Sequence, residues 1–412
     1  MFLAIGLVLL APVTRAGAAE AGSTQTYTWG SGDQSREFIV YTPSGYKPSR
    51  PMPLVVLAHG CMTTADQMMR ASLFNEEAER KGFIVMYPDV DQAQADLPQP
   101  LKRCWRFYEE SSWHRDQGDA AAIAGMTRET MRLRAVDRQR VYMSGASAGG
   151  FMTSILTAAY PDLYAAVAIA AAGQYEDTAC VAAMPGLMPP STSAQLAFEE
   201  MGDRARIVPR MVIGGDADQG IVPACADKAL EQGLRTDNLV LGSSQESPIS
   251  LAPAMSREVP KAGGYPTTVS TYLDPAGCVI GERWMIHGMN HFWPGGSTDP
   301  ELANFTDPKG PNGAEAVWQF LQRYTRDETA MPCAETPICR RHFIFVRVAK
   351  NVNRAVATVD GERAPTRLRR GWLRIKVPVT RRARTAIGLK LRAKGGRKVE
   401  RRATFKGCGP AR

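Results

Sequence analysis

One serine in this chain has the sequence context of an enzymatic nucleophile. Ser147 lies within Gly145-Ala146-Ser147-Ala148-Gly149, after the strand-like run Val141–Met143 and before the helix-compatible run Phe151–Ala159. A serine on a sharp strand-to-helix turn is a nucleophile elbow, and its flanking glycines allow strand and helix to approach closely. The helix N-terminus would also place N–H groups beside a developing oxyanion. The pattern predicts acyl-transfer chemistry at Ser147.

A serine nucleophile needs a base, and the chain has only five histidines. His287 and His291 follow a candidate acid in the chain, which is the order Ser, Asp, His of α/β-hydrolases. His291 lies in a glycine-containing loop beyond a predicted strand, whereas His287 lies at the end of that strand. We therefore predict His291 as the base and keep His287 as the alternative.

The acid that orients the base is expected at the end of another strand. Gly214-Gly215-Asp216-Ala217-Asp218 follows a buried apolar run, and open α/β sheets bind ligands at the carboxyl ends of their strands. Asp218 is the predicted acid and Asp216 the alternative. The carboxylate that is not catalytic would suit a cap of the following turn or helix.

An oxyanion site needs two N–H donors. We expect one from Ala148, the residue after the nucleophile, and the other from Cys61, in the loop after the second strand. A backbone donor of this kind typically contributes a factor of about a hundred to a thousand in turnover. His59, in the same loop, is predicted to pack beneath it.

Five blocks together carry a resemblance to a known family. They are His59-Gly60-Cys61, Cys104-Trp105, Gly145-Ala146-Ser147-Ala148-Gly149-Gly150, Gly215-Asp216-Ala217-Asp218 and Gly288-Met289-Asn290-His291-Phe292-Trp293-Pro294-Gly295-Gly296. In this order they resemble the poly(3-hydroxybutyrate) depolymerase family of esterases, which is akin to secreted feruloyl and acetylxylan esterases.

The resemblance implies a secreted serine esterase with Ser147, Asp218 and His291 as its triad and Cys61 and Ala148 as its oxyanion hole. It implies no metal and no organic cofactor. Two positions depart from the family pattern: Asn290 stands where a glycine is expected, and Arg106-Phe107 follows Cys104-Trp105 where a second tryptophan is common.

Tryptophans are the side chains expected around the substrate. Trp105 and Trp293 are predicted to line an apolar acyl or aryl cleft, with Trp113 as a weaker candidate because ordinary core packing explains it equally well. The substrate predicted first is a polyester such as poly(3-hydroxybutyrate) or its oligomers. A feruloyl or acetylxylan type of polysaccharide esterase is the alternative, and a binding or adhesion protein on an inactive hydrolase fold is the non-enzymatic one.

The elements that would hold this site alternate between strands and helices. Such alternation predicts an α/β-hydrolase with a doubly wound, mostly parallel sheet over residues 25–330. The predicted strands are 37–41, 53–60, 83–88, 140–144, 165–171, 210–215, 268–273 and 283–286; the predicted helices are 66–80, 119–133, 151–159, one from about 225, and 314–324. Residues 174–206, which contain several prolines, are predicted to be irregular, as a lid or insertion.

The last part of the chain differs in texture and charge. From Arg340 to Arg412 there are 23 Lys and Arg against three Asp and Glu, whereas the rest of the chain carries 27 against 38. Short strand-like runs with Asp360-Gly361 and Gly395-Gly396 as turn signals predict a small all-β, sandwich-like domain at 335–412. We expect this basic unit to contact an anionic polymer or the cell envelope; nucleic acid is disfavoured because aromatic platforms for bases are scarce.

The N-terminus and the cysteines predict export. An apolar run, residues 1–10, leads into small residues suited to cleavage, which favours a removed signal peptide at 1–19 over an uncleaved anchor. No later run is long enough to span a membrane. Eight cysteines in an exported chain favour disulfides. The expected pairs are Cys61–Cys104, Cys180–Cys225, Cys278–Cys333 and Cys339–Cys408.

Overall fold

The computed structural model describes residues 22–180, 187–242, 249–275 and 277–326, and then 338–340, 343–348, 352–359, 362–369, 372–376, 384–393 and 398–406. The predicted signal peptide lies outside these residues. In the described part of the chain, no helix combines the length and the apolar character that crossing a bilayer requires.

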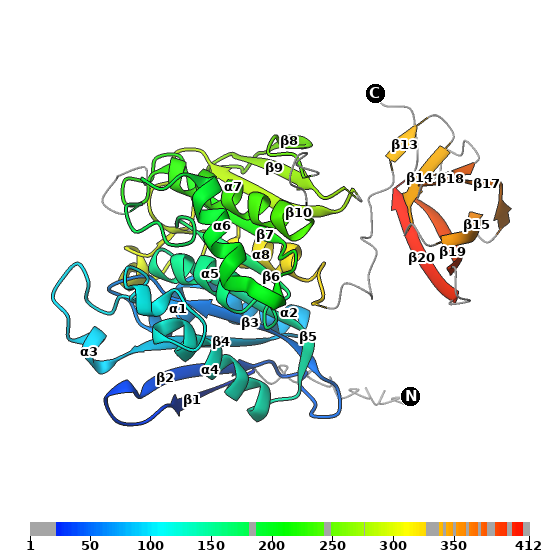
Figure 1. Ribbon diagram of the computed structural model, residues 1–412. Helices are drawn as coiled ribbons and strands as arrows, with labels where there is room; N and C mark the ends of the chain where they lie inside the picture. The colour runs from blue at the N-terminus through cyan, green and yellow to red at the C-terminus, as the bar shows by residue number, and fades with distance from the viewer. Residues whose placement is uncertain are drawn as a thin grey trace, which may run out of the picture.

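A ten-stranded sheet organises the first part of the chain (Figure 1). Its spatial order is β1-β2-β4-β3-β5-β6-β7-β10-β9-β8. The strands are β1 (Ser23–Trp29), β2 (Arg36–Thr42), β3 (Met52–Ala58), β4 (Ile84–Asp91), β5 (Val136–Ala146), β6 (Ala166–Ala170), β7 (Arg210–Gly215), β8 (Met255–Val259), β9 (Thr267–Leu273) and β10 (Val279–Ile286). The run from β4 to β10 is parallel, and antiparallel strands complete both edges. The predicted α/β-hydrolase architecture is confirmed.

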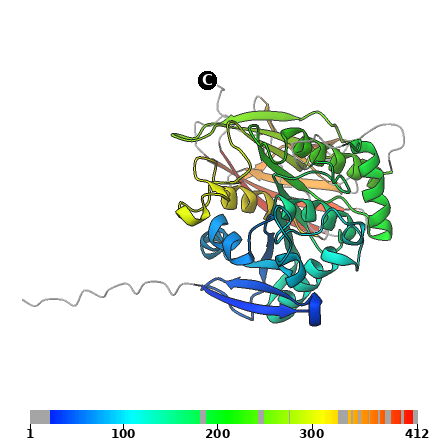
Figure 2. The ribbon, with the colours of Figure 1, turned by 90° about the vertical axis from the view of Figure 1, so that its left-hand side faces the viewer.

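Helices cover both faces of this sheet (Figures 1 and 2). They are α1 (Ala65–Ser72), α2 (Phe74–Lys81), α3 (Gln92–Ala95), α4 (Gly118–Leu133), α5 (Ala148–Ala159), α6 (Pro190–Met201), α7 (Pro223–Val240) and α8 (Gly313–Leu321). Side chains alternate across a strand, so each strand serves two cores. Leu54 and Val56 of β3 join the core formed with α4, α5, α6 and α7, whereas Val55 and Leu57 join the core formed with α1, α2 and α8.

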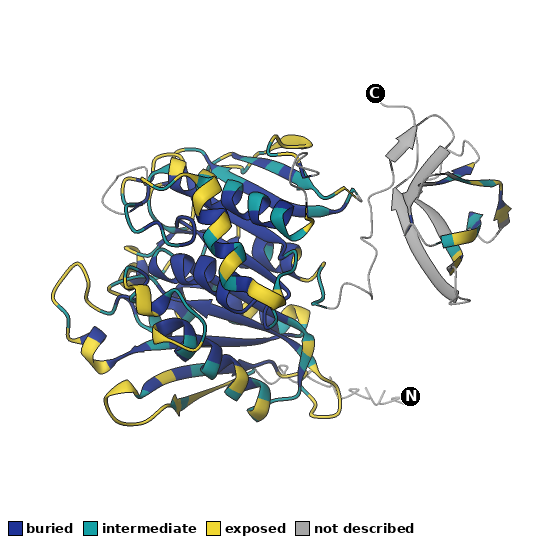
Figure 3. Ribbon diagram, in the orientation of Figure 1, coloured by how far each residue is buried: buried dark blue, intermediate teal, exposed yellow. Residues whose placement is uncertain are grey.

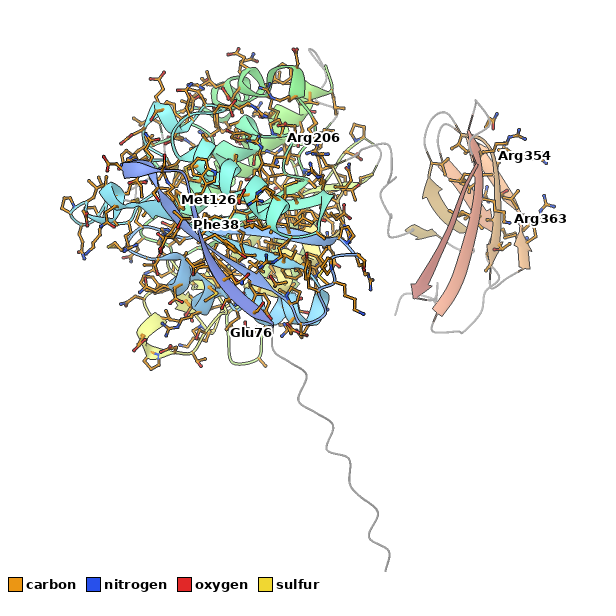
Figure 4. The ribbon with its side chains drawn as sticks, turned by 90° about the horizontal axis from the view of Figure 1, so that it is seen from below. Phe38, Glu76, Met126, Arg206, Arg354 and Arg363 are labelled. Atoms are coloured by element: carbon orange, nitrogen blue, oxygen red, sulfur yellow. A yellow bond between two sulfur atoms is a disulfide. The ribbon has the colours of Figure 1, made fainter. Side chains whose placement is uncertain are left out.

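The burial pattern follows from this layering. Most residues of the central strands are buried, and exposed residues gather on the outer helix faces and loops (Figure 3). Phe38 of β2 and Met126 of α4, both fully buried, belong to the same core cluster (Figure 4). A parallel sheet buried on both faces holds its strand ends rigidly, which is what a site at those ends requires.

Two secondary-structure predictions were wrong. The single helix predicted at 66–80 is two helices, α1 and α2, because Leu73 between them takes a left-handed conformation with φ 59°. The segment predicted to be irregular contains α6, which begins with Pro190. Proline is favoured at the first helical position, since its missing N–H has no intrahelical acceptor there.

Strands β13–β20 form two further sheets, ordered β13-β14-β18-β17 and β16-β15-β19-β20. They are β13 (Ile338–Arg340), β14 (Phe343–Arg347), β15 (Val352–Val359), β16 (Glu362–Ala364), β17 (Thr366–Arg369), β18 (Trp372–Lys376), β19 (Arg384–Ala393) and β20 (Lys398–Lys406). A shared core includes Leu373 and Ile375 from the first sheet and Ala357, Val359 and Leu391 from the second. The two sheets therefore pack as a sandwich, as predicted.

Two of the four expected disulfides are present, Cys61–Cys104 and Cys180–Cys225. The other two pairings involve Cys333 and Cys408, which lie outside the described residues. Cys278 is itself disulfide-bonded. Cys61–Cys104 ties the loop that follows β3 to the segment after α3, and Cys180–Cys225 ties a segment beyond β6 to the first turn of α7.

Candidate active site

Ser147 occupies a strained turn between β5 and α5. Its φ of 56° and ψ of −122° lie where residues other than glycine are rare. Its N–H donates to the Ala170 carbonyl of the neighbouring strand at 2.9 Å, which fixes the turn against the sheet. A Cβ on Gly145 would collide with the Gly149 backbone across the turn, and a Cβ on Gly149 would collide with the Ala58 carbonyl at the end of β3, so this close approach needs both glycines.

His291 reaches Ser147 from the loop that follows β10. Its Nε2 lies 3.0 Å from Ser147 Oγ, and its Nδ1 lies 2.9 Å from Asp218 Oδ2 and 3.1 Å from Oδ1. The imidazole is 32% exposed, whereas the Asp218 side chain is 1% exposed. The three side chains, far apart in sequence, thus form one continuous hydrogen-bonded path.

Asp218 is held by backbone donors as well as by the imidazole. Its Oδ1 accepts from the N–H of Gly220 at 2.9 Å and from that of Ile221 at 2.8 Å. Gly220 lies against the imidazole, since a Cβ on this residue would approach His291 Cγ to 3.1 Å. A buried carboxylate with these donors can fix the orientation of the imidazole and stabilise its positive charge.

The alternative pair, Asp216 and His287, lies next to the first one. His287 Nδ1 is 2.8 Å from Asp216 Oδ2, and its Nε2 is 2.7 Å from Thr268 Oγ1, which in turn donates to Glu258. Burial raises the pKa of Asp216, but the Gly288 N–H and His287 outweigh it, so the pKa lies below its ordinary value. Both side chains are more than a third exposed, and no serine meets this imidazole among the hydrogen bonds of the described residues.

The Gly60–Cys61 peptide lies beside the serine. A Cβ on Gly60 would come within 3.2 Å of Ser147 Cβ. The Gly60 carbonyl accepts from His59 Nδ1 at 2.7 Å and from Thr63 Oγ1 at 2.6 Å. Because a trans peptide points its N–H away from its carbonyl, these bonds fix the direction of the Cys61 N–H. In the described part of the chain, neither this N–H nor that of Ala148 is paired with an acceptor, so both can donate to an oxyanion.

His59 packs beneath this loop, as predicted. It is fully buried, its ring contacts that of Trp105, and its Nε2 lies 3.2 Å from Asp89 Oδ1. Burial raises the pKa of Asp89, but the hydrogen bond and charge of His59 and two backbone N–H groups outweigh it, and that pKa is lowered. His59 therefore supports the loop and does not contact the reacting atoms.

The two predicted cleft tryptophans are buried. Trp105 is 0% exposed and donates its Nε1 to the His59 carbonyl at 3.1 Å; Trp293 is 2% exposed and contacts Phe74 at 5.8 Å between ring centroids. Burial in the core is more favourable for such large apolar rings than exposure to solvent. Neither indole has exposed surface that a substrate could contact in this arrangement. Contact of Trp105 and Trp293 with a substrate therefore stays a prediction.

Three residues near the triad were given no role at the site by the sequence analysis. Met62, which follows Cys61, and Leu101 are 48% and 40% exposed, and the Met62 N–H donates to the carbonyl of Lys102, the residue after Leu101. Asn290 links the two loops that carry Asp218 and His291. The sequence signal for this role was the asparagine itself, at a position where the family pattern has a glycine. At the other departure, Arg106 pairs with the buried Asp91 and Phe107 stacks on Phe151 of α5.

The chain matches a family of known esterases. The family model "Esterase PHB depolymerase" matches residues 36–246, a span that includes Ser147 and Asp218 and ends before His291. Poly(3-hydroxyalkanoate) depolymerase C of Paucimonas lemoignei is 28% identical over 300 residues, which are 70% of this chain and 66%, just under two thirds, of the depolymerase.

Two further relatives agree with that match. Feruloyl esterase B of Neurospora crassa is 30% identical over 225 residues, 52% of this chain and 74% of the esterase. The solved acetyl xylan esterase from Aspergillus awamori has a TM-score of 0.53 at 20% identity and covers 66% of this chain and 94% of its own. The structural match supports the fold, and the resemblance drawn from the five sequence blocks is confirmed.

Proposed function

Since the chain belongs to the esterase PHB depolymerase family, a family of carboxylic ester hydrolases, we propose that it is a serine esterase with Ser147 as nucleophile, His291 as base and Asp218 as acid. The single observation that carries the proposal is the path from Asp218 through His291 to Ser147, with hydrogen-bond distances of 2.9 and 3.0 Å. Burial of Asp218 and the backbone donors on its carboxylate add to it.

In the first half-reaction Ser147 Oγ attacks the ester carbonyl while its proton passes to His291 Nε2. The negative charge that develops on the carbonyl oxygen is stabilised by the N–H groups of Cys61 and Ala148. The tetrahedral intermediate then expels the alcohol, which takes the proton from His291. The acid part of the ester is left bound to Ser147 Oγ.

In the second half-reaction water attacks the acyl group on Ser147 as His291 Nε2 accepts a proton from it. Collapse of the new tetrahedral intermediate returns that proton to Ser147 Oγ and releases the carboxylic acid. Asp218 stays ionised throughout and stabilises the transient imidazolium. The reaction consumes one water and needs no electron transfer.

The substrate that we propose is a polyester such as poly(3-hydroxybutyrate) or its oligomers. The match to a poly(3-hydroxyalkanoate) depolymerase supports this choice. So does the exposed apolar side chain of Met62, the residue after Cys61, because a polyester chain offers few groups that need polar partners. The match to feruloyl esterase B keeps a polysaccharide ester as the competing substrate.

We further propose that the protein is secreted after removal of residues 1–19. The two described disulfides support this, since disulfides persist in oxidising compartments and are rare in the cytosol.

For residues 335–412 we propose a separate accessory domain that attaches the catalytic domain, residues 25–330, to an anionic polymer. Arg354 of β15 lies directly opposite Arg392 of β19, and both are exposed, as is Arg363 (Figure 4). Like charges opposite each other in a sheet are destabilising, so a surface that keeps them favours an anionic partner.

Hydrolysis of p-nitrophenyl butyrate by the full chain tests the chemistry. Turnover in the wild type that Ser147→Ala abolishes supports the esterase. Absence of turnover in the wild type would instead support a binding protein on an inactive hydrolase fold. Comparing polyester film, methyl ferulate and acetylated xylan then ranks the substrates, and the polyester proposal fails if either polysaccharide-type ester is hydrolysed with the highest kcat/KM.

Attachment is tested with Arg354→Gln/Arg392→Gln in the full chain. Sedimentation with insoluble polygalacturonate should weaken in this variant, and binding of the wild type should be lost in 0.5 M salt, where charges are screened within a few ångströms. Unchanged attachment of the variant would reject the domain's proposed role, and stronger binding to DNA than to polygalacturonate would reassign its partner.

A further inference from the structure

The acid and the base of the site come from two loops that run side by side. One follows β7 and carries Asp216 and Asp218; the other follows β10 and carries His287 and His291. Strands β7 and β10 are parallel neighbours, so both loops start at the same edge of the sheet, with Gly215 opposite Ile286. Beyond those positions the ladder has ended, and other contacts must hold the loops in register.

Four backbone or carboxylate contacts continue the pairing. The Asp216 N–H donates to the Ile286 carbonyl at 3.1 Å, and the Ala217 N–H donates to the Met289 carbonyl at 3.2 Å. The Asp216 carboxylate also binds across, accepting from the Gly288 N–H at 2.6 Å and lying 2.8 Å from His287 Nδ1. The loops are therefore fastened at the end nearest the sheet.

At the far end, besides the contact between Asp218 and His291 Nδ1, one side-chain atom of Asn290 joins the two loops. Asn290 Oδ1 accepts from the Gln219 N–H at 3.0 Å and from the His291 N–H at 2.8 Å. Gln219 is the residue after Asp218, so one amide oxygen joins the backbone next to the acid to the backbone of the base. A glycine at position 290 has no side-chain oxygen that could accept these two hydrogen bonds.

We propose that Asn290 is a positioning residue: its amide oxygen locks the backbone beside Asp218 to that of His291, while Asp216 and His287 hold the other end of the same two loops. The inference rests on the proposed triad of Ser147, His291 and Asp218. It also gives a role to Asp216 and His287, the pair that competes with the triad residues in the sequence.

The position of Asn290 decides what its loss would change. The side chain is exposed, so water can replace the lost acceptor, and the effect on stability should be small. The geometry of a proton relay is less tolerant, because misplacement by 1 Å can cost as much as a hundredfold in rate. A positioning role therefore predicts a loss of kcat with little change in KM or Tm, whereas a merely structural role predicts a loss of Tm with kcat retained.

The test compares Asn290→Ala, Asn290→Gly and Asn290→Asp with wild type, with Asn304→Ala as a control at another exposed asparagine. We expect kcat on p-nitrophenyl butyrate to fall about tenfold in Asn290→Ala and further in Asn290→Gly, because glycine adds backbone freedom. KM should stay within about twofold and Tm within about 2 °C. Asn290→Asp keeps the acceptor and should recover most of kcat at alkaline pH, while its added charge moves the acidic limb of the pH–rate profile upward.

A double variant tests whether Asp216 and Asn290 act together or independently. If both ends set one register, Asp216→Asn and Asn290→Ala should be non-additive, with a combined loss of kcat that differs from the product of the single losses. Retention of wild-type kcat in Asn290→Ala, or a loss matched by Asn304→Ala, would overturn the proposal. Full turnover by Ser147→Ala would refute the triad itself. Failure of the Asn290 proposal alone gives a different result, in which wild type is active, Ser147→Ala is inactive and Asn290→Ala is as active as wild type.

Discussion

Two Asp–His pairs lie side by side at the ends of β7 and β10, and they differ in what surrounds them. Asp218 is buried and accepts two backbone N–H bonds, and its histidine reaches Ser147; Asp216 is exposed, and its histidine reaches Thr268, whose hydroxyl donates to Glu258. The residue types are the same in both pairs. Burial, and the presence of a strained serine at the third position, separate the pair that can transfer a proton productively from the pair that fastens two loops.

Replacing each histidine in turn breaks this comparison most strongly. We expect His291→Ala to lower kcat about 10⁴-fold, because the base and the leaving-group acid are both lost. His287→Ala is the matched control and should lower kcat less than tenfold. Steady-state hydrolysis of p-nitrophenyl butyrate measures both, and equal losses would remove the distinction between the pairs.

The carboxylates sharpen the same comparison. Asp218→Asn should lower kcat by about 10³- to 10⁴-fold, since an amide neither enforces the productive orientation of the imidazole nor stabilises its positive charge. Asp216→Asn should lower it about threefold, through the loop register alone. A larger loss of kcat in Asp216→Asn than in Asp218→Asn would show that Asp216, and not Asp218, is the acid of the triad.

The two described disulfides form a second matched pair, with sequence separations of 43 and 45 residues. Closed loops of similar length predict similar losses in the free energy of unfolding on replacement by serine, about 2–4 kcal/mol. Only Cys61→Ser/Cys104→Ser should also lower kcat, by about tenfold, because this bond restrains the Gly60–Cys61 peptide, whose N–H is our proposed oxyanion donor. Denaturant unfolding and kinetics measure the two effects, and a larger kcat loss in Cys180→Ser/Cys225→Ser would contradict the assignment.

The smallest effect concerns pH. The pKa of Asp216 is lowered in the folded state, so its contribution to stability is present above the pKa of the unfolded chain, about 3.9, and is lost as the pH falls through the folded value. The difference in Tm between wild type and Asp216→Asn should therefore shrink from pH 7 to pH 3. A difference that grows over this interval would contradict the pairing with His287 and Gly288.

The sequence was sufficient for the parts of the fold with strong local signals. Buried apolar runs predicted β3, β4 and β7, and Gly-x-Ser-x-Gly predicted the turn at Ser147, because a close backbone approach tolerates few other residues. Helix α6 was missed because consecutive prolines indicate a break, although proline is favourable at a helix start. The split between α1 and α2 depends on one left-handed residue, Leu73, whose side chain gives no local signal.

The site was predictable in composition and less so in arrangement. Asp216 and Asp218, like His287 and His291, follow the same strands within a few residues, so local sequence ranks the alternatives without separating them. Which carboxylate is buried depends on Gly220 and Ile221 folding back over Asp218, a tertiary contact. The same holds for Trp105 and Trp293, since their burial depends on rings and carbonyls contributed by distant segments.

The most direct test of the central claim is covalent labelling of the full chain with an organophosphonate ester, followed by mass spectrometry of the digested protein. A triad of Ser147, His291 and Asp218 predicts one adduct, on Ser147, formed with loss of p-nitrophenyl butyrate hydrolysis. The adduct should be absent in Ser147→Ala and form far more slowly in His291→Ala than in His287→Ala. An adduct on another residue, or undiminished ester hydrolysis by Ser147→Ala, would contradict this triad.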